Sequence, residues 1–483
     1  MQTFPGLARS LLPLCIVLLL GSGCNDHQEF LRLDEDILSF NFSENSRQLL
    51  ISSVRYDPQD PWTSIGGAKT IRVFDLESMK VTHTFHYPHG MVSRPVYSCA
   101  DPNVIAFGLS EAEVPEGPYT PMKLTFIDLS TERVIAELPT ELLLQSVRKK
   151  HTWYPFPDGD FLCNLEKNTM YLAALKDRVQ AVDGSTGAVK TEYLIAEPGN
   201  EVYRLVFPFE QVDRLVVANT SNSDFRVFRL STGEFLGTVT LPSQLLGQGM
   251  GDMVRVDADK LVLEYTVKVS QSTYDAHLLV VDVDDLRVVD DFTLSGKHVY
   301  MHFAMEYGKL LVVLAEGDDI CGSIVRFDWR TGEAETVFDV CSVLLTGPIA
   351  PVLDAGRVYI QPYEALGPST YNARFYSWPD FTLIGEVPKS SGYYALAYIP
   401  ERKRFVFEDL AINGLAFVDP VAAKETGDLS GVCRRVNEGS LIVDPAGRYA
   451  AVECTRNSPA SMEDPTGAGI SVVKLDGYLP NDP

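Results

Sequence analysis

Apolar and polar residues alternate along many short segments of this chain, and turn-forming residues separate the segments. Residues 324–338 read I-V-R-F-D-W-R-T-G-E-A-E-T-V-F, which predicts a strand ending at Asp328, a turn through Thr331 and Gly332, and a second strand. In similar units the first strand ends near Asp75, Asp128, Asp183, Arg229, Asp282, Ser377, Asp419 and Asp476. Neighbouring positions lie 42 to 57 residues apart, a period that indicates a β-propeller of four-stranded blades.

Nine blade-like repeats can be counted, and units of this kind bury their faces only against each other. Most propellers have four to eight blades, so the pattern leaves eight and nine blades open, with one weak unit absorbed by a neighbour in the first case. The sequence supplies no fourth strand for the last unit. Because an open sheet edge is a liability, we expect residues 29–33 to fill that place. The expected fold is all-β, a single propeller over residues 29–483.

The N-terminal segment has the features of a signal peptide. Arg9 precedes an apolar run at residues 11–20, which is too short to span a bilayer as a permanent helix. Gly21, Ser22 and Gly23 then precede Cys24, and this resembles the lipobox of bacterial lipoproteins, although Gly21 stands where Leu is commonest. The resemblance implies that residues 1–23 are removed and that Cys24 carries lipid.

Lipidation at Cys24 would leave residues 24–28 as a short tether. The protein would then be exported and anchored in the bacterial cell envelope, on the periplasmic or the outer side, touching the membrane only through its lipid. The alternative is an ordinary signal peptide that is cut nearby. No later segment has 18 continuous apolar residues.

Charge and cysteine content add two constraints. With 65 acidic and 41 basic residues the chain has a formal charge of −24, which argues against nucleic acid or anionic lipid as a partner. Six cysteines follow Cys24, and an even number in an exported chain favours disulfides. The strand order predicts the pairs Cys321–Cys341 and Cys433–Cys454 and leaves Cys99–Cys163 by elimination.

Two repeat motifs resemble known propeller families. Residues 42–53, F-S-E-N-S-R-Q-L-L-I-S-S, look like the start of WD40-like and TolB-type repeats, and residues 181–187, A-V-D-G-S-T-G, resemble the repeat of quinoprotein-type propellers. In the quinoenzymes a Trp follows the Gly, whereas Lys190 and Thr191 occupy that region here. The resemblance therefore implies the fold alone, which a non-catalytic lipoprotein of the outer-membrane assembly machine also uses. We expect Asp183 to be structural, accepting N–H groups of its turn.

The long Pro- and Gly-rich insertions give the main functional signal. Residues 57–69, 110–121, 363–372 and 455–469 all fall between the second and third strands of a repeat, and in a propeller those connections share one face. Irregular loops on a rigid scaffold are typical of recognition surfaces, and neutral loop variation is the alternative. Trp62, Tyr119 and Tyr371 are the candidate contacts.

These features predict a lipid-anchored binding or assembly scaffold whose partner is a protein or an extracellular polymer. The alternative is a lactonase-like or quinoprotein-like propeller enzyme with a site at the channel mouth, for which His302 and Glu306 are candidates. We expect no cofactor and no metal. His83 and His86 are three residues apart, which sends them to opposite faces of a strand.

Overall fold

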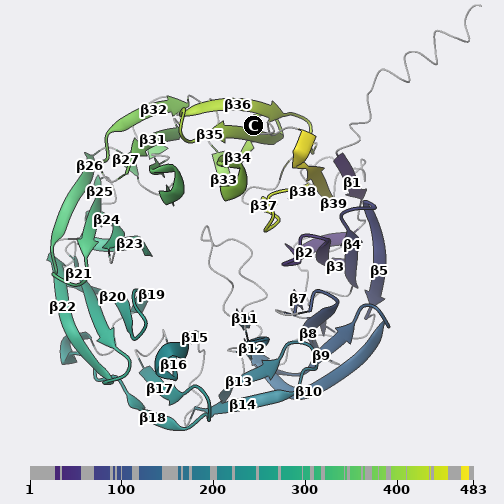
Figure 1. Ribbon diagram of the computed structural model, residues 1–483, viewed down its shortest axis with the longest axis horizontal. Helices are drawn as coiled ribbons and strands as arrows, with labels where there is room; N and C mark the ends of the chain where they lie inside the picture. The colour runs from purple at the N-terminus through teal and green to yellow at the C-terminus, as the bar shows by residue number, and fades with distance from the viewer. Residues whose placement is uncertain are drawn as a thin grey trace, which may run out of the picture.

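Short buried strands form wherever the sequence runs apolar. In β8 (Val104–Ser110) six of the seven residues are buried, as expected for a strand that is covered on both faces. In β5 (Lys80–His86) exposed and half-buried residues alternate without a break, as expected for a strand with one solvent-facing side. Figure 1 shows the reason: strands such as β8 lie inside a ring, and strands such as β5 form its outer wall.

The computed structural model describes a large part of the chain. The described residues are 28–32, 35–55, 70–87, 91–92, 95–98, 101–110, 119–143, 161–164, 167–172, 177–195, 204–219, 224–245, 250–269, 274–295, 297–304, 309–316, 321–341, 343–344, 349–360, 363–364, 373–378, 380–387, 393–409, 411–433, 436, 440–454 and 469–477.

Within these residues the strands form nine antiparallel blade sheets around the ring and one additional two-stranded sheet, so the repeat count of nine is confirmed and eight blades are excluded. The first three blades contain β2 (Glu35–Phe42), β3 (Gln48–Arg55), β4 (Thr70–Asp75) and β5; β6 (Met91–Val92), β7 (Val96–Tyr97), β8, β9 (Tyr119–Asp128) and β10 (Arg133–Leu143); and β11 (Phe161–Asn164), β12 (Thr169–Leu172), β13 (Arg178–Asp183) and β14 (Val189–Leu194).

The next three blades contain β15 (Arg204–Phe209), β16 (Arg214–Asn219), β17 (Asp224–Arg229) and β18 (Phe235–Thr238); β19 (Met250–Arg255), β20 (Lys260–Lys268), β21 (Tyr274–Asp282) and β22 (Arg287–Ser295); and β23 (Lys297–Ala304), β24 (Lys309–Glu316), β25 (Cys321–Asp328) and β26 (Ala334–Cys341). The last three contain β28 (Ile349–Val352), β29 (Arg357–Ile360), β31 (Ala373–Ser377) and β32 (Leu383–Val387); β33 (Tyr393–Ile399), β34 (Arg404–Asp409), β35 (Gly414–Asp419) and β36 (Lys424–Leu429); and β37 (Ile442–Val443), β38 (Tyr449–Cys454), β39 (Gly469–Lys474) and β1 (Gln28–Arg32).

The apolar core lies between blades rather than inside one. Each described cluster of buried residues draws its members from two neighbouring blades. The cluster between the last and first blades, for example, brings Ile470 and Val472 against Leu49, Ile51 and Phe74. A single blade would leave one or both of its faces in water, so the ring is stabilised by the contacts between its units.

Two sets of contacts close the ring where the first and last blades meet. β1 pairs antiparallel with β39 along its whole length, from Gln28 opposite Val473 to Arg32 opposite Gly469, so the chain's N-terminal strand completes its last blade. The observed strand begins and ends one residue earlier than the segment 29–33 that the sequence suggests. A second contact joins two turns: the Ala446 N–H donates to Ser46 Oγ (3.0 Å) and Arg448 Nη2 donates to the Ser46 carbonyl (2.8 Å).

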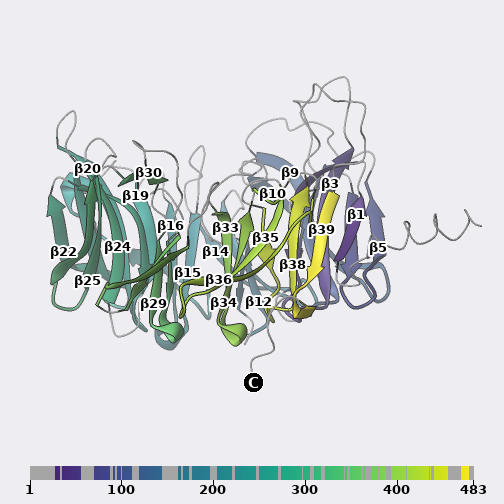
Figure 2. The ribbon, with the colours of Figure 1, turned by 90° about the horizontal axis from the view of Figure 1, so that it is seen from above.

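The two faces of the ring have different connections (Figure 2). We call the strands of a blade A to D from the channel outward. The lower face carries the A–B and C–D turns, several of which contain a short 3-10 helix: η2 (Glu210–Val212), η5 (Leu353–Ala355), η6 (Pro400–Arg402) and, after β39, η8 (Leu475–Gly477). The upper face carries the B–C and D–A connections, including η3 (Ser243–Leu245).

Candidate binding face

The C–D turns of the lower face are closed by the carboxylate that ends strand C. Asp183 Oδ1 accepts the N–H groups of Ser185 (3.0 Å) and Thr186 (2.9 Å) and the Thr186 hydroxyl. Asp282 and Asp419 each accept two turn N–H groups in the same way. These bonds satisfy backbone donors that the hairpin leaves unpaired. The structural role expected for these aspartates is therefore confirmed.

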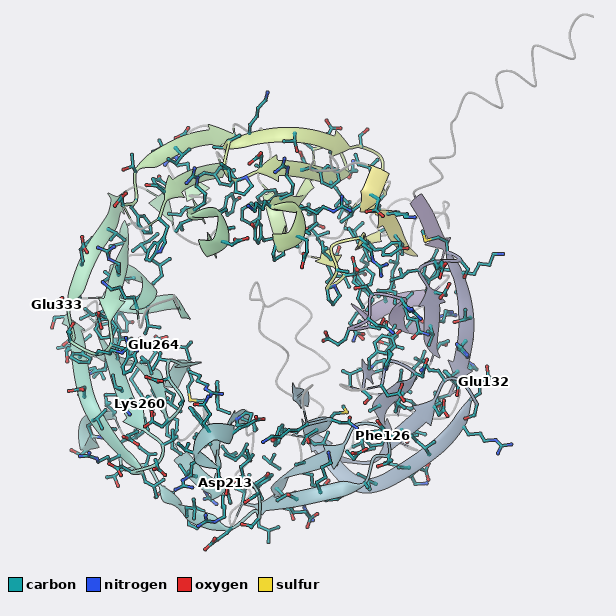
Figure 3. The ribbon with its side chains drawn as sticks, in the orientation of Figure 1. Phe126, Glu132, Asp213, Lys260, Glu264 and Glu333 are labelled. Carbon is teal, nitrogen blue, oxygen red and sulfur yellow. A yellow bond between two sulfur atoms is a disulfide. The ribbon has the colours of Figure 1, made fainter. Side chains whose placement is uncertain are left out.

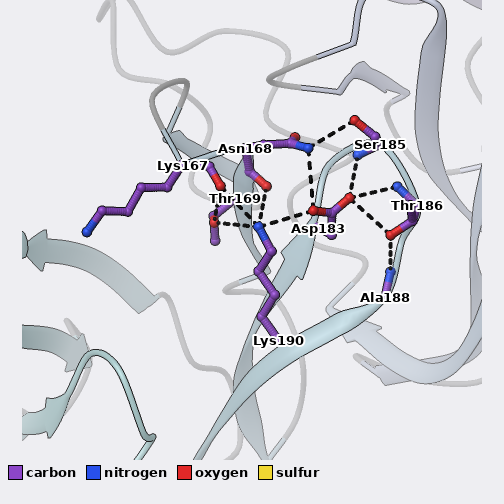
Figure 4. Close-up of polar contacts among 8 residues, drawn as sticks. All are labelled: Lys167, Asn168, Thr169, Asp183, Ser185, Thr186, Ala188 and Lys190. Carbon is purple, nitrogen blue, oxygen red and sulfur yellow. Dashed lines mark hydrogen bonds and ion pairs between the residues drawn. The ribbon is translucent and has the colours of Figure 1, made fainter.

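Lys190 takes the place where the quinoenzyme repeat has its Trp, and it has a different function (Figure 4). Its ammonium donates to the carbonyls of Lys167 (3.0 Å) and Asn168 (2.8 Å) and to Thr169 Oγ1, and it lies 3.2 Å from Asp183 Oδ2. Burial raises the pKa of Asp183, but hydrogen bonds from Lys190 and Thr186 outweigh it and the pKa is lowered. Lys190 thus ties the A–B turn of this blade to its C–D turn.

The C–D hairpins also fix how neighbouring blades approach each other. The last turn residue has positive φ, for example Met79 at 54°, Leu286 at 55° and Gly332 at 73°, so positive φ alone does not require glycine here. Steric contact does: a Cβ on Gly332 would lie 2.1 Å from the Phe292 ring of the preceding blade, and one on Gly187 would lie 2.8 Å from the Phe126 ring, which is labelled in Figure 3.

Where the turn carries a side chain, the neighbouring blade provides the glycine. A Cβ on Gly237 of β18 would lie 3.0 Å from Leu286, and a Cβ on Gly385 of β32 would lie 2.8 Å from Ala423 Cβ. Each of these contacts between neighbouring blades therefore has a glycine either in the turn or in the strand that the turn packs against. The lower turns are short, and packing between blades determines their conformation, so these residues have a structural role.

On the upper face the connections themselves form secondary structure. β27 (Val343–Leu344), in the connection between two blades, pairs with β30 (Tyr363–Glu364) of the next blade. β6 pairs with the upper end of β8, and Val436 forms a bridge with Cys454 at the end of β38. In the second blade, the pairing of β9 with β10 continues to Tyr119 and Leu143, beyond the last β8 pair at Leu109 and Lys123. The upper face thus carries structure beyond what the ring requires.

Buried carboxylates lie at the upper end of β34, in the middle of β20 and in the lower A–B turn of the last blade, where Asp444 is 3% exposed. Glu408 and Asp409, at the end of β34, are 0% and 1% exposed, and Glu264 of β20 is 5% exposed. Glu408 Oε1 accepts a bond from Ser440 Oγ (3.4 Å), and Asp409 Oδ1 accepts one from the Ala411 N–H (3.0 Å). Burying a carboxylate costs desolvation free energy, and an apolar side chain in the same place would not have this cost. No local sequence pattern reveals these residues.

Two histidines, which could in principle be metal ligands, are instead hydrogen-bonded to protein side chains. His277 of β21 bonds through Nδ1 to Asp291 Oδ1 at 2.9 Å, and His86 Nδ1 lies 3.1 Å from Thr70 Oγ1. His83 stacks on Phe85. Within the part of the chain that the structure describes, no group of three or more His, Cys, Asp or Glu residues could hold a metal ion.

The cysteine predictions have different outcomes. The disulfide predicted between Cys433 and Cys454 is present, with a Cα–Cα distance of 5.5 Å. The strand register places Cys321 directly opposite Cys341, and their bond stays a prediction because these two side chains are outside the described part of the chain. Cys163 lies in β11, whereas Cys99 lies outside the described residues, so that pair also stays a prediction.

The predicted contact residues fall mostly outside the described residues. Trp62, Tyr371 and the lipidation candidate Cys24 all do, as does Glu306 of the alternative enzyme site, while His302 lies in β23. Tyr119 is the first residue of β9. One predicted boundary was wrong: Ser110 belongs to β8 and residues 119–121 belong to β9, so the insertion in this blade is confined to residues 111–118. β30 likewise occupies the start of the insertion at 363–372.

Comparison with known proteins extends only to the fold. No protein-family model and no curated protein matches the chain. A solved structure described as a eukaryotic initiation factor is 10% identical, with 85% of this chain and 92% of that chain covered and a TM-score of 0.53. BamB from Moraxella catarrhalis is 14% identical (78% of this chain and 95% of that chain covered, TM-score 0.40), and the C-terminal WD40 domain of Sif2 is 10% identical (78% and 94% covered, TM-score 0.43).

The chain is a nine-bladed β-propeller. At these identities the likeness shows the fold alone. No described helix of the propeller is long and apolar enough to cross a membrane.

Proposed function

We propose that this propeller is a lipid-anchored binding or assembly scaffold of the bacterial cell envelope and that its upper face binds a protein or an extracellular polymer. One observation carries the proposal: the difference between the two faces. The lower turns are short and engaged in closing and docking the blades, whereas the upper connections form β27, β30 and β6 and include a disulfide. A rigid ring that bears elaborated connections on one face has the form of a recognition scaffold.

Two of the buried carboxylates support the same face. Glu408 and Asp409 lie at the upper end of β34, where burial costs free energy that the fold alone does not require. Cys433 and Cys454 join a D–A connection to the end of β38 beside Ser440, whose hydroxyl bonds Glu408 and accepts the Glu453 N–H. The upper end of the eighth and ninth blades is therefore held in one arrangement, as a binding surface needs to be.

The test removes upper connections without disturbing the ring. Ser53 pairs directly with Thr70, and Cys454 pairs directly with Gly469, so short Gly-Ser turns can replace residues 56–69 and 455–468 while keeping these registers. The matched control replaces exposed lower-turn residues, Glu44→Ala and Glu77→Ala.

Wild type and variants are used to capture partners from detergent-solubilised envelopes, and bound material is identified by mass spectrometry. We expect a partner that wild type and the lower-turn control retain and that the upper variants lose, with the far-ultraviolet circular dichroism unchanged. Equal capture by the upper variants would refute the proposal.

A further inference from the structure

The direction of β1 shows at which rim of the ring the chain enters its last blade. β1 is the outermost strand of the last blade and runs antiparallel to β39, with Gln28 opposite Val473 and Arg32 opposite Gly469. β39 in turn runs toward the lower face, because η8 follows Lys474 and the Leu475 N–H donates to the carbonyl of Arg448 in the lower A–B turn. Gln28 is therefore the lower end of β1, so the chain enters the ring at its lower rim.

The reach of the chain before Gln28 is short. Four residues separate the Cα atom of Cys24 from that of Gln28 in sequence, and an extended chain spans at most about 3.6 Å per residue, so they lie within ~14 Å of each other. A lipid on Cys24 thus holds the lower rim close to the headgroups, whatever conformation the tether adopts. The opposite rim is farther away by the height of a blade: β36 and its flanking residues, from Ala422 to Ser430, span roughly 26 Å at about 3.3 Å per residue.

We propose that the lower face of the ring is turned to the lipid bilayer and that the upper face is presented away from it. The inference rests on the proposed function, since it takes Cys24 as the lipidated residue. The partner of the lower rim is the membrane that holds the lipid on Cys24, and insertion of the acyl chains keeps the rim there without a basic patch. On the lower face the eighth and ninth blades are joined by the ion pair of Arg402 with Asp476.

The geometry gives the scaffold a defined direction. The pairing of β1 with β39 fixes the N-terminal strand to the ninth blade, and the two bonds to Ser46 fix the ninth blade to the first, so the anchor point does not shift relative to the ring. The upper connections face the aqueous compartment, where a partner approaches without meeting the bilayer. A partner bound there is held at about one blade height from the lipid.

The test measures energy transfer to the membrane from both ends of one strand. A genetically encoded fluorescent amino acid is placed at Ala422, at the lower end of β36, or at Ser430, at its upper end; both residues are exposed. Glu77 provides a second lower position on the other side of the junction. The lipidated protein is reconstituted in vesicles of phosphatidylethanolamine and phosphatidylglycerol that carry a headgroup-linked acceptor.

We expect higher transfer efficiency at Ala422 and Glu77 than at Ser430. Inserting a flexible twelve-residue Gly-Ser linker before His27, which adds about 40 Å of reach, should abolish the difference. Equal transfer at the three positions without the linker, or higher transfer at Ser430, would overturn the inference.

A separate measurement tests lipidation at Cys24 independently of the orientation of the ring. Flotation with the same vesicles is compared for wild type and Cys24→Ala. If both float equally, lipidation at Cys24 is wrong, and the proposed function loses its membrane anchor. If wild type alone floats and the transfer order is reversed, the scaffold proposal stands and the orientation is wrong.

Discussion

Replacing Gly332 by alanine adds a single methyl group at the contact between two blades and so tests how tightly they pack. The new Cβ would lie 2.1 Å from Cε1 of Phe292, and Gly332 has φ of 73°. The backbone conformation costs alanine roughly 1–2 kcal/mol, and forcing a methyl into a packed contact costs about 1–3 kcal/mol more. Phe292 also packs edge-on against Phe327 at 5.1 Å between ring centroids, so the ring cannot simply turn away. The expected loss of unfolding free energy is about 2–5 kcal/mol.

Gly431 provides the matched control. It has φ of 70°, but an added Cβ would meet nothing within 4 Å, so Gly431→Ala should lose only the conformational part, about 1–2 kcal/mol. Both variants are unfolded in urea under oxidising conditions and followed by tryptophan fluorescence and circular dichroism. Phe292→Leu in the Gly332→Ala background should recover part of the loss. If the two glycine variants are equally stable, turn glycines do not set the approach of neighbouring blades.

Three further predictions follow from the turns and the disulfide. Lys190→Met removes a half-exposed ammonium from three acceptors and from Asp183, and we expect a loss of about 1 kcal/mol in urea unfolding; an unchanged midpoint would show that the contact is not stabilising. Burial raises the pKa of Asp282, but bonds from turn N–H groups and from Lys260 lower the pKa overall. The ionised carboxylate therefore stabilises the fold above its unfolded pKa, and this stabilisation is lost as the pH falls. Asp282→Asn should flatten the decrease in unfolding free energy that is measured below about pH 5, and a slope identical to that of wild type would contradict this. Cys433→Ser should lower the unfolding free energy by about 2–4 kcal/mol and leave it less sensitive to reductant than that of wild type, and an equal response to dithiothreitol would show that Cys433–Cys454 does not stabilise the fold.

The fold could be predicted because its determinants repeat in the sequence. Asp128, Asp183 and Asp282 end strands at regular intervals, and each such turn forms nearly the same local hydrogen bonds. The missing strand of the last blade pointed to β1 by elimination, since an open sheet edge is costly. The number of blades stayed open at eight or nine because sequence spacing does not determine whether a weak unit pairs as its own sheet.

The candidate face was only partly predictable. The insertions indicated which face to consider, but β27 and β30 pair across two blades, and two-residue strands have no hydrophobic pattern of their own. Glu408 is an ordinary charged residue in the sequence, and its burial depends on a neighbouring blade and on Ser440. The contact between Gly237 and Leu286 was missed for the same reason. The two residues lie in neighbouring blades, and the need for a glycine at 237 follows only from the Leu286 side chain that packs against it.

Photo-crosslinking from single positions in intact cells tests the central claim most directly. A photo-reactive amino acid is placed at Val269 or Ser430 on the upper face and at Glu77 or Ala422 on the lower face, all of which are exposed. If the upper face binds the partner, irradiation gives a discrete protein or polymer adduct from upper positions, and the lower positions give none. Adducts from the lower positions alone would contradict the account.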